Sequence, residues 1–413
     1  MISAQRALTP FDDDAEPEIV LRGMRETSPP RRTGRIEQLE AQVAGLLARM
    51  KIAVIHGGDK SNAGAVIHQT ANTRSWKSYR NVAEDIGAAL ERLGAKTVQL
   101  MADDMTLGEN LRRAEIDLAW LNTGGVQGYS PMSHAAAMLE MFGIPYVGHD
   151  PLAAGMLDNK LVFKRELQAL GVRTAPFVGW HPSRGPADPS QGPAFDLIFA
   201  DYAGPFVVKP VTGRASLHVH VVNERSDLAA IADQVFRATN NHVLIEAFLP
   251  GREFCIAVCG GVVARKRRLA HHHEPFVFSP AERMLAAGER IFTSMDQQPI
   301  TVDRVHLLEG ESEREIIARL HEVARVIFIE LNLATLIRLD LRMGSDGEIY
   351  VLEANPKPDL AKPTSRKTSI VCVGLGGSGM DYDDLILSLL AERIDLVFRR
   401  GRGSPHHLIE LLA

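Results

Sequence analysis

Four side chains that could together bind a metal ion and an anionic group fall within residues 338–355, RLDLRMGSDGEIYVLEAN. Polar and apolar residues alternate in the first half of this stretch, as in a half-buried strand, and GSDG is typical of a tight turn. A second apolar run follows, so the stretch predicts a β-hairpin. If the turn closes symmetrically around its central Ser-Asp pair, Arg338 lies opposite Glu353. Asp340 then lies opposite Val351.

The predicted hairpin brings four polar side chains to one face, because side chains alternate along each strand. They are Arg338, Asp340, Glu353 and Asn355. Two carboxylates and an amide offer only oxygen ligands, which Mg²⁺ prefers together with water and phosphate oxygens. The arginine suits an anionic group beside the metal. The alternative is an exposed hairpin with surface ion pairs, and a register shifted by one residue would separate the two acids.

Two lysines upstream of the hairpin, Lys160 and Lys209, could bind phosphate as point charges. Lys209 lies between the apolar run FVV and Pro210, where a solvent-exposed lysine is unexpected. The loop that follows, VTGRAS, offers backbone N–H groups and a serine hydroxyl that could wrap a terminal phosphate. It lacks the GK[ST] of a Walker A loop. Taken alone, each lysine is more often a solvated surface residue.

The stretch HVLIEAFLPGREF reads as a strand, a short connector and a turn at Pro250 and Gly251. Glu246 and Glu253 flank that turn. A connector between two lobes could hold a flat base through backbone groups, with a carboxylate on the ribose hydroxyls. Two surface glutamates beside a turn are the alternative.

Two further motifs are weaker. GLGGSG at residues 374–379 matches GxGxxG, but only 34 residues follow it and they contain no convincing strand, which disfavours a dinucleotide site. The adjacent histidines 271–273 point in different directions on any regular element, so they rarely form one metal shell. With the basic run at residues 265–268 they predict a basic loop, either facing an anionic ligand or solvated.

Length and composition limit the class of protein. The 413 residues suffice for two or three domains or one multi-lobed enzyme, and the net charge of -5 argues against a general nucleic-acid binder. Three cysteines without a CxxC motif fit a reducing compartment. No run of about 18 apolar residues predicts a membrane span. The acidic residues 12–14 stand where a signal peptide would need basic ones. We therefore expect a soluble cytoplasmic enzyme with no nucleic-acid or membrane partner.

The periodicity predicts how the chain is organised. Strands alternate with helices between residues 51 and 150, which predicts a parallel-sheet α/β domain, and the later part reads as α+β with antiparallel strand pairs. One continuous helix is expected at 152–170 with Lys160 inside it, another at 227–239 with Ser226 as its N-cap, and irregular structure at 265–300. An amphipathic helix at 34–50 could pack on the body or on another subunit.

In order along the chain, four stretches resemble the ATP-grasp superfamily and, within it, the D-alanine–D-alanine ligase family. They read MLEMFGIPYVGHDPLAAGMLDNK, FVVKPVTGRAS, HVLIEAFLPGREF and RLDLRMGSDGEIYVLEANPKPDL. The resemblance implies an N-terminal α/β domain followed by a two-lobed ATP-grasp fold, with ATP between the lobes. The expected division is: 1–50 tail and helix, 51–150 N-terminal α/β domain, 151–245 central lobe, 246–398 C-terminal lobe with the hairpin, and 399–413 C-terminal tail.

The resemblance also implies roles for individual residues. Six would bind ATP: Lys160 and Lys209 on the phosphates, Ser216 in the loop over the γ-phosphate, Glu246 and Leu249 at the adenine connector, and Glu253 on the ribose. Asp340, Glu353 and Asn355 resemble the ligands of two Mg²⁺ ions, and Arg338 would face the transferred phosphate. The implied reaction converts a carboxylate into an acyl phosphate, from which an amine displaces phosphate.

The substrate-binding stretches depart from the family pattern. Thr73 or Arg74 falls where the family has an acidic residue for the first substrate's ammonium group, and Thr364 or Ser365 stands near a family hydroxyl. We therefore expect a carboxylate–amine ligase for small substrates other than a D-alanine pair. Arg74 or the basic 265–268 run could recognise an acidic one. The alternatives are a true D-alanine–D-alanine ligase, an ATP-grasp enzyme that phosphorylates or carboxylates, and a nucleotide-binding protein that has lost ligation. A homodimer is a further expectation.

Overall fold

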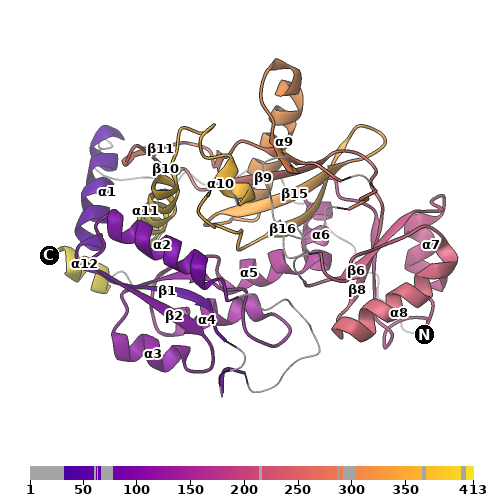
Figure 1. Cartoon of the computed structure of the whole chain (residues 1–413), viewed down its shortest axis with the longest axis horizontal. Helices are drawn as coiled ribbons and strands as arrows, with labels where there is room; N and C mark the ends of the chain where they lie inside the picture. Colours follow the sequence, from indigo (N-terminus) through magenta and orange to yellow (C-terminus); the bar gives the residue numbers. More distant parts are fainter. Residues whose placement is uncertain are drawn as a thin grey trace, which may run out of the picture.

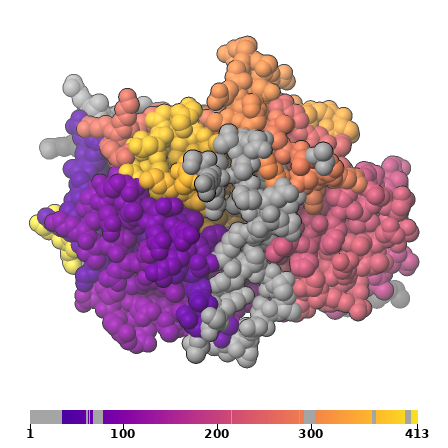
Figure 2. Space-filling model, in the orientation of Figure 1, coloured from indigo at the N-terminus to yellow at the C-terminus, as the bar shows by residue number. Residues whose placement is uncertain are grey.

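The structure is a computed structural model. It describes residues 32–59, 62, 64–66, 78–213, 216–286, 288–291, 304–364, 369–400 and 406–413. Figure 1 shows a parallel sheet at the lower left, a lobe with α7 and α8 at the right, and a large antiparallel sheet between and above them. The same three parts are visible on the surface in Figure 2. The prediction of an α/β part followed by α+β lobes is confirmed.

The N-terminal part is built on a parallel sheet of order β2-β1-β3-β4. Its strands are β1 (Lys51–Gly57), β2 (Thr97–Asp103), β3 (Leu118–Asn122) and β4 (Tyr146–Val147). Ile52 and Val54 of β1 pack into the core that includes α2 (Arg80–Arg92), while Ala53 and Ile55 pack with α3 (Leu107–Ala114) and α4 (His134–Met141). Helices on both faces explain why β1 reads as one continuous apolar run.

The central lobe is a four-stranded antiparallel sheet of order β5-β8-β6-β7. Its elements are β5 (Phe177–Trp180), α7 (Pro193–Phe199), β6 (Phe206–Pro210), β7 (His220–Val222), α8 (Leu228–Thr239) and β8 (Val243–Ala247). Aromatic and aliphatic side chains of α7 and α8 close its core. The prediction that Ser226 is the N-cap of α8 is wrong. Ser226 lies in a 3₁₀ turn, and Asp227 holds the cap position without a side-chain hydrogen bond.

The C-terminal lobe contains the largest sheet, of order β14-β13-β9-β15-β16, with β12 also paired to β9. Its elements are β9 (Glu253–Cys259), β12 (Phe276–Val277), β13 (Ala281–Arg283), β14 (Val305–Leu307), α9 (Arg314–Glu330), β15 (Ile337–Met343) and β16 (Ile349–Asn355). Leu339, Leu341 and Val351 pack with α9 in one core. The polar residues between them point to the other face.

The helix predicted at residues 152–170 is two helices, α5 (Pro151–Asp158) and α6 (Lys160–Ala169). Asn159 between them has an extended backbone, and its side chain accepts a hydrogen bond from the Val162 N–H, as an N-cap does. Lys160 is therefore the first residue of a helix and does not lie inside one. Its backbone N–H donates to the Val211 carbonyl of the central lobe.

The segment at 265–300 is not irregular throughout. The hairpin of β10 (Val262–Arg265) and β11 (Arg268–His271) precedes β12 and β13. Lys266 and Arg267 form its turn with positive φ values of 51° and 63°. The stretch before GLGGSG is also not a strand, since residues 370–373 form the short helix α10 (Ile370–Val373) ahead of α11 (Tyr382–Arg400). This context rules out a Rossmann fingerprint there.

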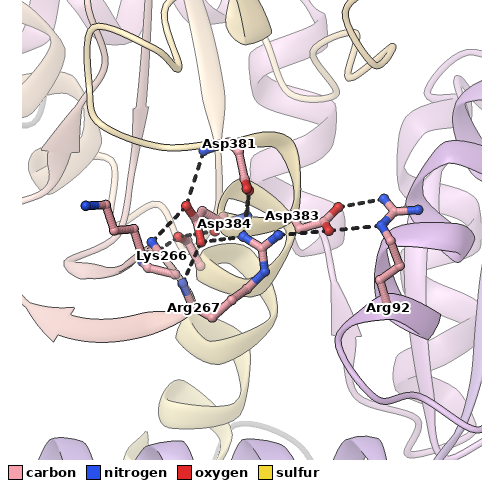
Figure 3. A network of polar contacts seen from close by, with 8 residues as sticks. Arg92, Lys266, Arg267, Asp381, Asp383 and Asp384 are labelled. Atoms are coloured by element: carbon pink, nitrogen blue, oxygen red, sulfur yellow. Dashed lines mark hydrogen bonds and ion pairs between the residues drawn. The ribbon is translucent and has the colours of Figure 1, made fainter.

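The basic hairpin turn packs on the start of α11 and does not face the proposed ligand site. Arg267 forms ion pairs with Asp381, Asp383 and Asp384 (Figure 3). Arg92 of α2 pairs with Asp383 at 2.6 Å, which ties the N-terminal part to the C-terminal lobe.

The N-terminal helix α1 (Arg32–Leu47) packs on the body of this chain. Its residues Leu39, Val43 and Leu46 are buried in the core shared with α2 and α11. The C-terminal helix α12 (His406–Leu412) joins that core through Leu408. None of the helices in the described ranges is long and apolar enough to cross a membrane.

Candidate active site

The predicted hairpin forms, but with a different register. Arg338 pairs with Asn355 and Asp340 with Glu353, where a symmetric turn had predicted Glu353 and Val351. The difference arises from a β-bulge after Asp340, at which Leu352 is left without a partner. A ladder without the bulge would pair Asp340 with Leu352 and turn Glu353 to the opposite face. The bulge therefore keeps both acids on one face.

Asp340 lies at the centre of the polar face. Arg338 donates two hydrogen bonds to it at 2.7 and 2.8 Å, Arg283 donates a third at 3.1 Å, and Asn355 Nδ2 lies 3.4 Å from Oδ2. Cys255 Sγ is 3.3 Å from Oδ1. Burial alone would raise the pKa of Asp340, but the two guanidinium groups outweigh it and hold the pKa below its usual range. Asp340 is therefore an anion at neutral pH.

The two predicted phosphate-binding lysines approach from different elements. Lys160 Nζ lies 3.2 Å from Glu353 Oε2, and it donates to the Gly213 carbonyl at 3.1 Å. Lys209 Nζ lies 2.5 Å from Glu246 Oε1. The lysine of α6 and the lysine of β6 thus lie against carboxylates of β16 and β8.

Glu246 is buried between two ammonium groups. Besides Lys209, Lys164 lies 2.9 Å from it and also donates to Thr174, whose hydroxyl donates to the Val351 carbonyl of β16. Burial would raise the pKa of Glu246, but the two lysines lower it. Burial lowers the pKa of Lys164, because its side chain is fully enclosed. Hydrogen bonds therefore connect Lys209 to the strand that carries Glu353.

Eight of the predicted residues line one cavity between the central and C-terminal lobes: Lys160, Lys209, Ser216, Glu246, Leu249, Glu253, Asp340 and Glu353. Arg338 and Asn355 join it through their bonds to Asp340. The cavity encloses about 100 Å³. Typical ligand pockets enclose roughly 300–1,000 Å³.

Of the predicted substrate residues, only Thr364 belongs to the part of the chain that the structure describes. Thr364 is exposed and does not line the cavity. Thr73, Arg74 and Ser365 lie outside the described residues. Within the basic run 265–268, Arg265 bonds to the Ser378 carbonyl, Arg267 pairs with aspartates at the start of α11, and Arg268 pairs with Glu40 of α1. These side chains are held by the chain's own groups, and none of them lines the cavity.

Three cavity or network residues were missed from the sequence: Lys164, Arg283 and Arg342. Arg342 could have been found, since it continues the alternation of Arg338 and Asp340. Lys164 lies one helical turn after Lys160, a spacing that places both on one side of a helix. Arg283 gave no signal, because its short strand β13 lies in a stretch without periodicity.

The donor set fits Mg²⁺ in chemistry, since Asp340, Glu353 and Asn355 supply hard oxygen atoms on one face. Among the described residues no group of three or more His, Cys, Asp or Glu side chains is arranged to hold a metal. Two carboxylates and one amide leave an octahedral ion short of ligands. Such sites are usually completed by water and substrate phosphates.

A second polar region lies where the hairpin meets the N-terminal sheet. Lys357, just after β16, places Nζ 3.5 Å from the centre of the Tyr79 ring and 3.4 Å from Asn122 Oδ1 at the end of β3. Asp103 ends β2 and is buried there, where it accepts a hydrogen bond from Thr123. Ligands of open α/β sheets bind at such carboxyl ends of strands.

Comparison with known proteins agrees with this architecture. In the bacterium Sinorhizobium fredii, an uncharacterized protein is 26% identical over 80% of this chain and 90% of its own length. The D-alanine–D-alanine ligase of Geobacter sulfurreducens is 25% identical over 77% of this chain and 91% of its own. Among solved structures, the D-alanine–D-alanine ligase of Bacillus anthracis complexed with ATP aligns with a TM-score of 0.61 at 20% identity, covering 85% of this chain and 100% of that one.

The fold of the central and C-terminal lobes is the ATP-grasp fold of the solved D-alanine–D-alanine ligases. A family model described as "D-ala D-ala ligase C-terminus" matches residues 167–391, more than half of the chain. The chain belongs to this family, and it is an ADP-forming ATP-grasp ligase.

Proposed function

We propose that this protein is an ATP- and Mg²⁺-dependent carboxylate–amine ligase whose substrates differ from a D-alanine pair. The observation that carries the proposal is the 3.2 Å contact between Lys160 and Glu353. We infer that a metal-bound phosphate would lie between this ammonium group and this carboxylate, because an ammonium group suits phosphate oxygens and a carboxylate suits Mg²⁺.

The proposed roles follow from the chemistry of each group. Lys160 and Lys209 would hold the phosphates of ATP, with Ser216 in the covering loop. Glu253 would hold the ribose, and the backbone around Leu249 the base. Glu246 would act through Lys209, because it is buried between two lysines and is not available to a ligand without displacing one.

Asp340, Glu353 and Asn355 would hold Mg²⁺, for which two ions are expected. The metal would neutralise the triphosphate and polarise the transferred phosphoryl group. Arg338 would stabilise negative charge on that group while remaining bonded to Asp340.

The reaction would run in two balanced steps. A carboxylate oxygen of the first substrate attacks the γ-phosphorus, and the bond from that phosphorus to ADP breaks. The amine of the second substrate, after losing a proton, attacks the acyl carbon, and inorganic phosphate leaves with the electrons of the broken C–O bond. The protein mainly positions reactants and neutralises charge.

The proposal of a different substrate rests on the region around Lys357. The buried ammonium group of Lys357 lies there, against Tyr79 and the end of β3. A cation at this junction favours an acidic substrate. Recognition by Arg74 stays a prediction. A solved structure with this fold is the D-Ala:D-Ser ligase of Enterococcus faecalis, so the fold is compatible with more than one amine.

The test is ADP release by the full chain with ATP, Mg²⁺ and a panel of D- and L-amino acids, acidic ones included, followed by the mass of the product. We expect turnover only when a carboxylate and an amine are both supplied. Asp340→Asn should abolish it. Glu348→Gln is the matched control, because Glu348 lies at the hairpin turn and pairs outward with Arg319.

Each alternative gives a different result. Turnover with D-alanine alone, yielding the dipeptide, would identify a true D-alanine–D-alanine ligase. Nucleotide binding with no turnover on any substrate would favour a protein that has lost ligation. A phosphorylated or carboxylated product would favour the third class. A homodimer and a cytoplasmic location stay predictions, the latter supported by three free buried cysteines.

A further inference from the structure

One guanidinium group bridges two carboxylates that the proposed function assigns to different parts of the ligand. Arg283 Nη1 donates to Glu253 Oε1 at 2.8 Å, and Nη2 donates to Asp340 Oδ2 at 3.1 Å. Glu253 is the proposed ribose ligand, and Asp340 is a proposed metal ligand. Arg283 therefore occupies positions that a loaded nucleotide and metal would need.

The sheet fixes Arg283 in this place. Strand β13 pairs with β9 so that Arg283 lies directly opposite Glu253, and β9 pairs with β15 so that Asp340 lies opposite Cys255, two residues further on. Only 12% of the Arg283 side chain is exposed. Arg342, on the other side of Glu253, lies 3.5 Å from its second oxygen. The bridge is thus part of the lobe's interior and is not a surface ion pair.

The bridge has a consequence for metal binding. A divalent ion at Asp340 would lie within a few ångströms of the guanidinium groups of Arg283 and Arg338, and like charges at that distance repel strongly in a buried site. Among the described residues, no group of three or more His, Cys, Asp or Glu side chains is placed to hold a metal ion. Phosphate oxygens would supply both the missing ligands and a new anionic partner for Arg283.

We propose that Arg283 is a built-in counter-ion that blocks the metal site until nucleotide arrives, so that divalent metal binds only together with nucleotide phosphate. On loading, the guanidinium group leaves Asp340 and Glu253 and moves to phosphate oxygens. This inference rests on the proposed function of the cavity.

Mn²⁺ binding without nucleotide tests the inference, measured by the loss of the free-ion EPR signal. Wild type should bind Mn²⁺ alone weakly. Arg283→Gln, which removes the charge, should bind it about tenfold more tightly or better. Arg283→Lys, which keeps the charge, should resemble wild type. Arg252→Gln is the control, because Arg252 directly precedes Glu253 in the chain but bonds to Glu282 and Glu313, which do not line the cavity.

Equal Mn²⁺ affinity of Arg283→Gln and wild type would overturn the inference, and so would weaker binding by that variant. If Arg283→Gln does not fold, wild type alone decides. Its melting temperature should rise with Mn²⁺ plus a non-hydrolysable ATP analogue but not with Mn²⁺ alone, and a rise with Mn²⁺ alone would refute the block. If wild type binds Mn²⁺ neither alone nor with the ATP analogue, the proposed function itself fails. Tight binding of Mn²⁺ without nucleotide is a different result, which would refute only the block.

Discussion

Asp340 and Glu353 lie directly opposite each other on β15 and β16, although the turn between these strands has a register that would not pair them. The residues next to the turn, such as Met343 and Ile349, follow one register. The bulge at Leu352 changes it by one residue just before Glu353, and Leu352 and Glu353 both line the cavity. One additional residue in a strand thus converts an ordinary hairpin into a pair of convergent acids.

If both carboxylates bind the same metal-bound phosphate, their substitutions should not be additive. We expect Asp340→Asn and Glu353→Gln each to lower the rate of ADP release by about 100-fold or more, and the double variant to lose little beyond that. The measurement is turnover at saturating ATP, with thermal melts to check folding and Glu348→Gln as control. Multiplied losses in the double variant would mean that the acids act independently.

We expect the two lysines around Glu246 to have different roles, one mainly in the stability of the fold and the other mainly in nucleotide binding. Lys209 lines the cavity and Lys164 does not. Lys164→Met should lower the free energy of unfolding by about 2 kcal/mol, because it leaves Glu246 with one counter-ion and Thr174 without its donor. Lys209→Met should instead weaken nucleotide binding by about tenfold or more. Urea unfolding and nucleotide titration measure the two quantities, and the same profile in both variants would contradict this division.

Asp103 should make stability depend on pH. Burial raises the pKa of this carboxyl group to about 6, although the Thr123 hydroxyl opposes the shift. The folded chain then binds more protons than the unfolded one between about pH 4 and 6, so stability falls as pH rises through that window. The loss is about 3 kcal/mol and is fully present above the folded pKa.

Asp103→Asn should remove this pH dependence, so urea unfolding should find the variant more stable relative to wild type at pH 7.5 than at pH 4.5. Thr123→Val should act in the opposite direction, because it removes the hydrogen bond that favours the charged form. A pH profile of Asp103→Asn that parallels wild type would count against the assignment.

Arg267 should matter for stability and not for substrate. Its side chain bonds three aspartates at the start of α11, one of which also binds Arg92 of α2 (Figure 3). Arg267→Gln should lower the free energy of unfolding by about 1–3 kcal/mol and leave the KM of every substrate unchanged. Arg268→Gln is the control, because its exposed pair with Glu40 should contribute less than about 1 kcal/mol. A raised KM for an acidic substrate in Arg267→Gln would restore the ligand-facing interpretation.

The sequence alone determined the elements whose signals are local. Alternation marked β15, and apolar runs marked β16 and β1, because these patterns follow directly from which faces of a strand are buried. The sequence also identified the site residues Lys209, Asp340 and Glu353, because charged side chains are rarely buried within apolar strands unless they are paired or bind a ligand. The order of the four stretches then predicted the family.

Tertiary structure decided the features that depend on contacts between segments distant in sequence. The bulge at Leu352, the break at Asn159 and the packing of α1 depend on which partner each segment meets. Arg283 lies 30 residues after Glu253 and 57 before Asp340. Its role exists only because β13, β9 and β15 lie side by side in one sheet. The short sequence of β13 has no pattern that predicts this arrangement, because the arrangement is stabilised by contacts between residues distant in sequence.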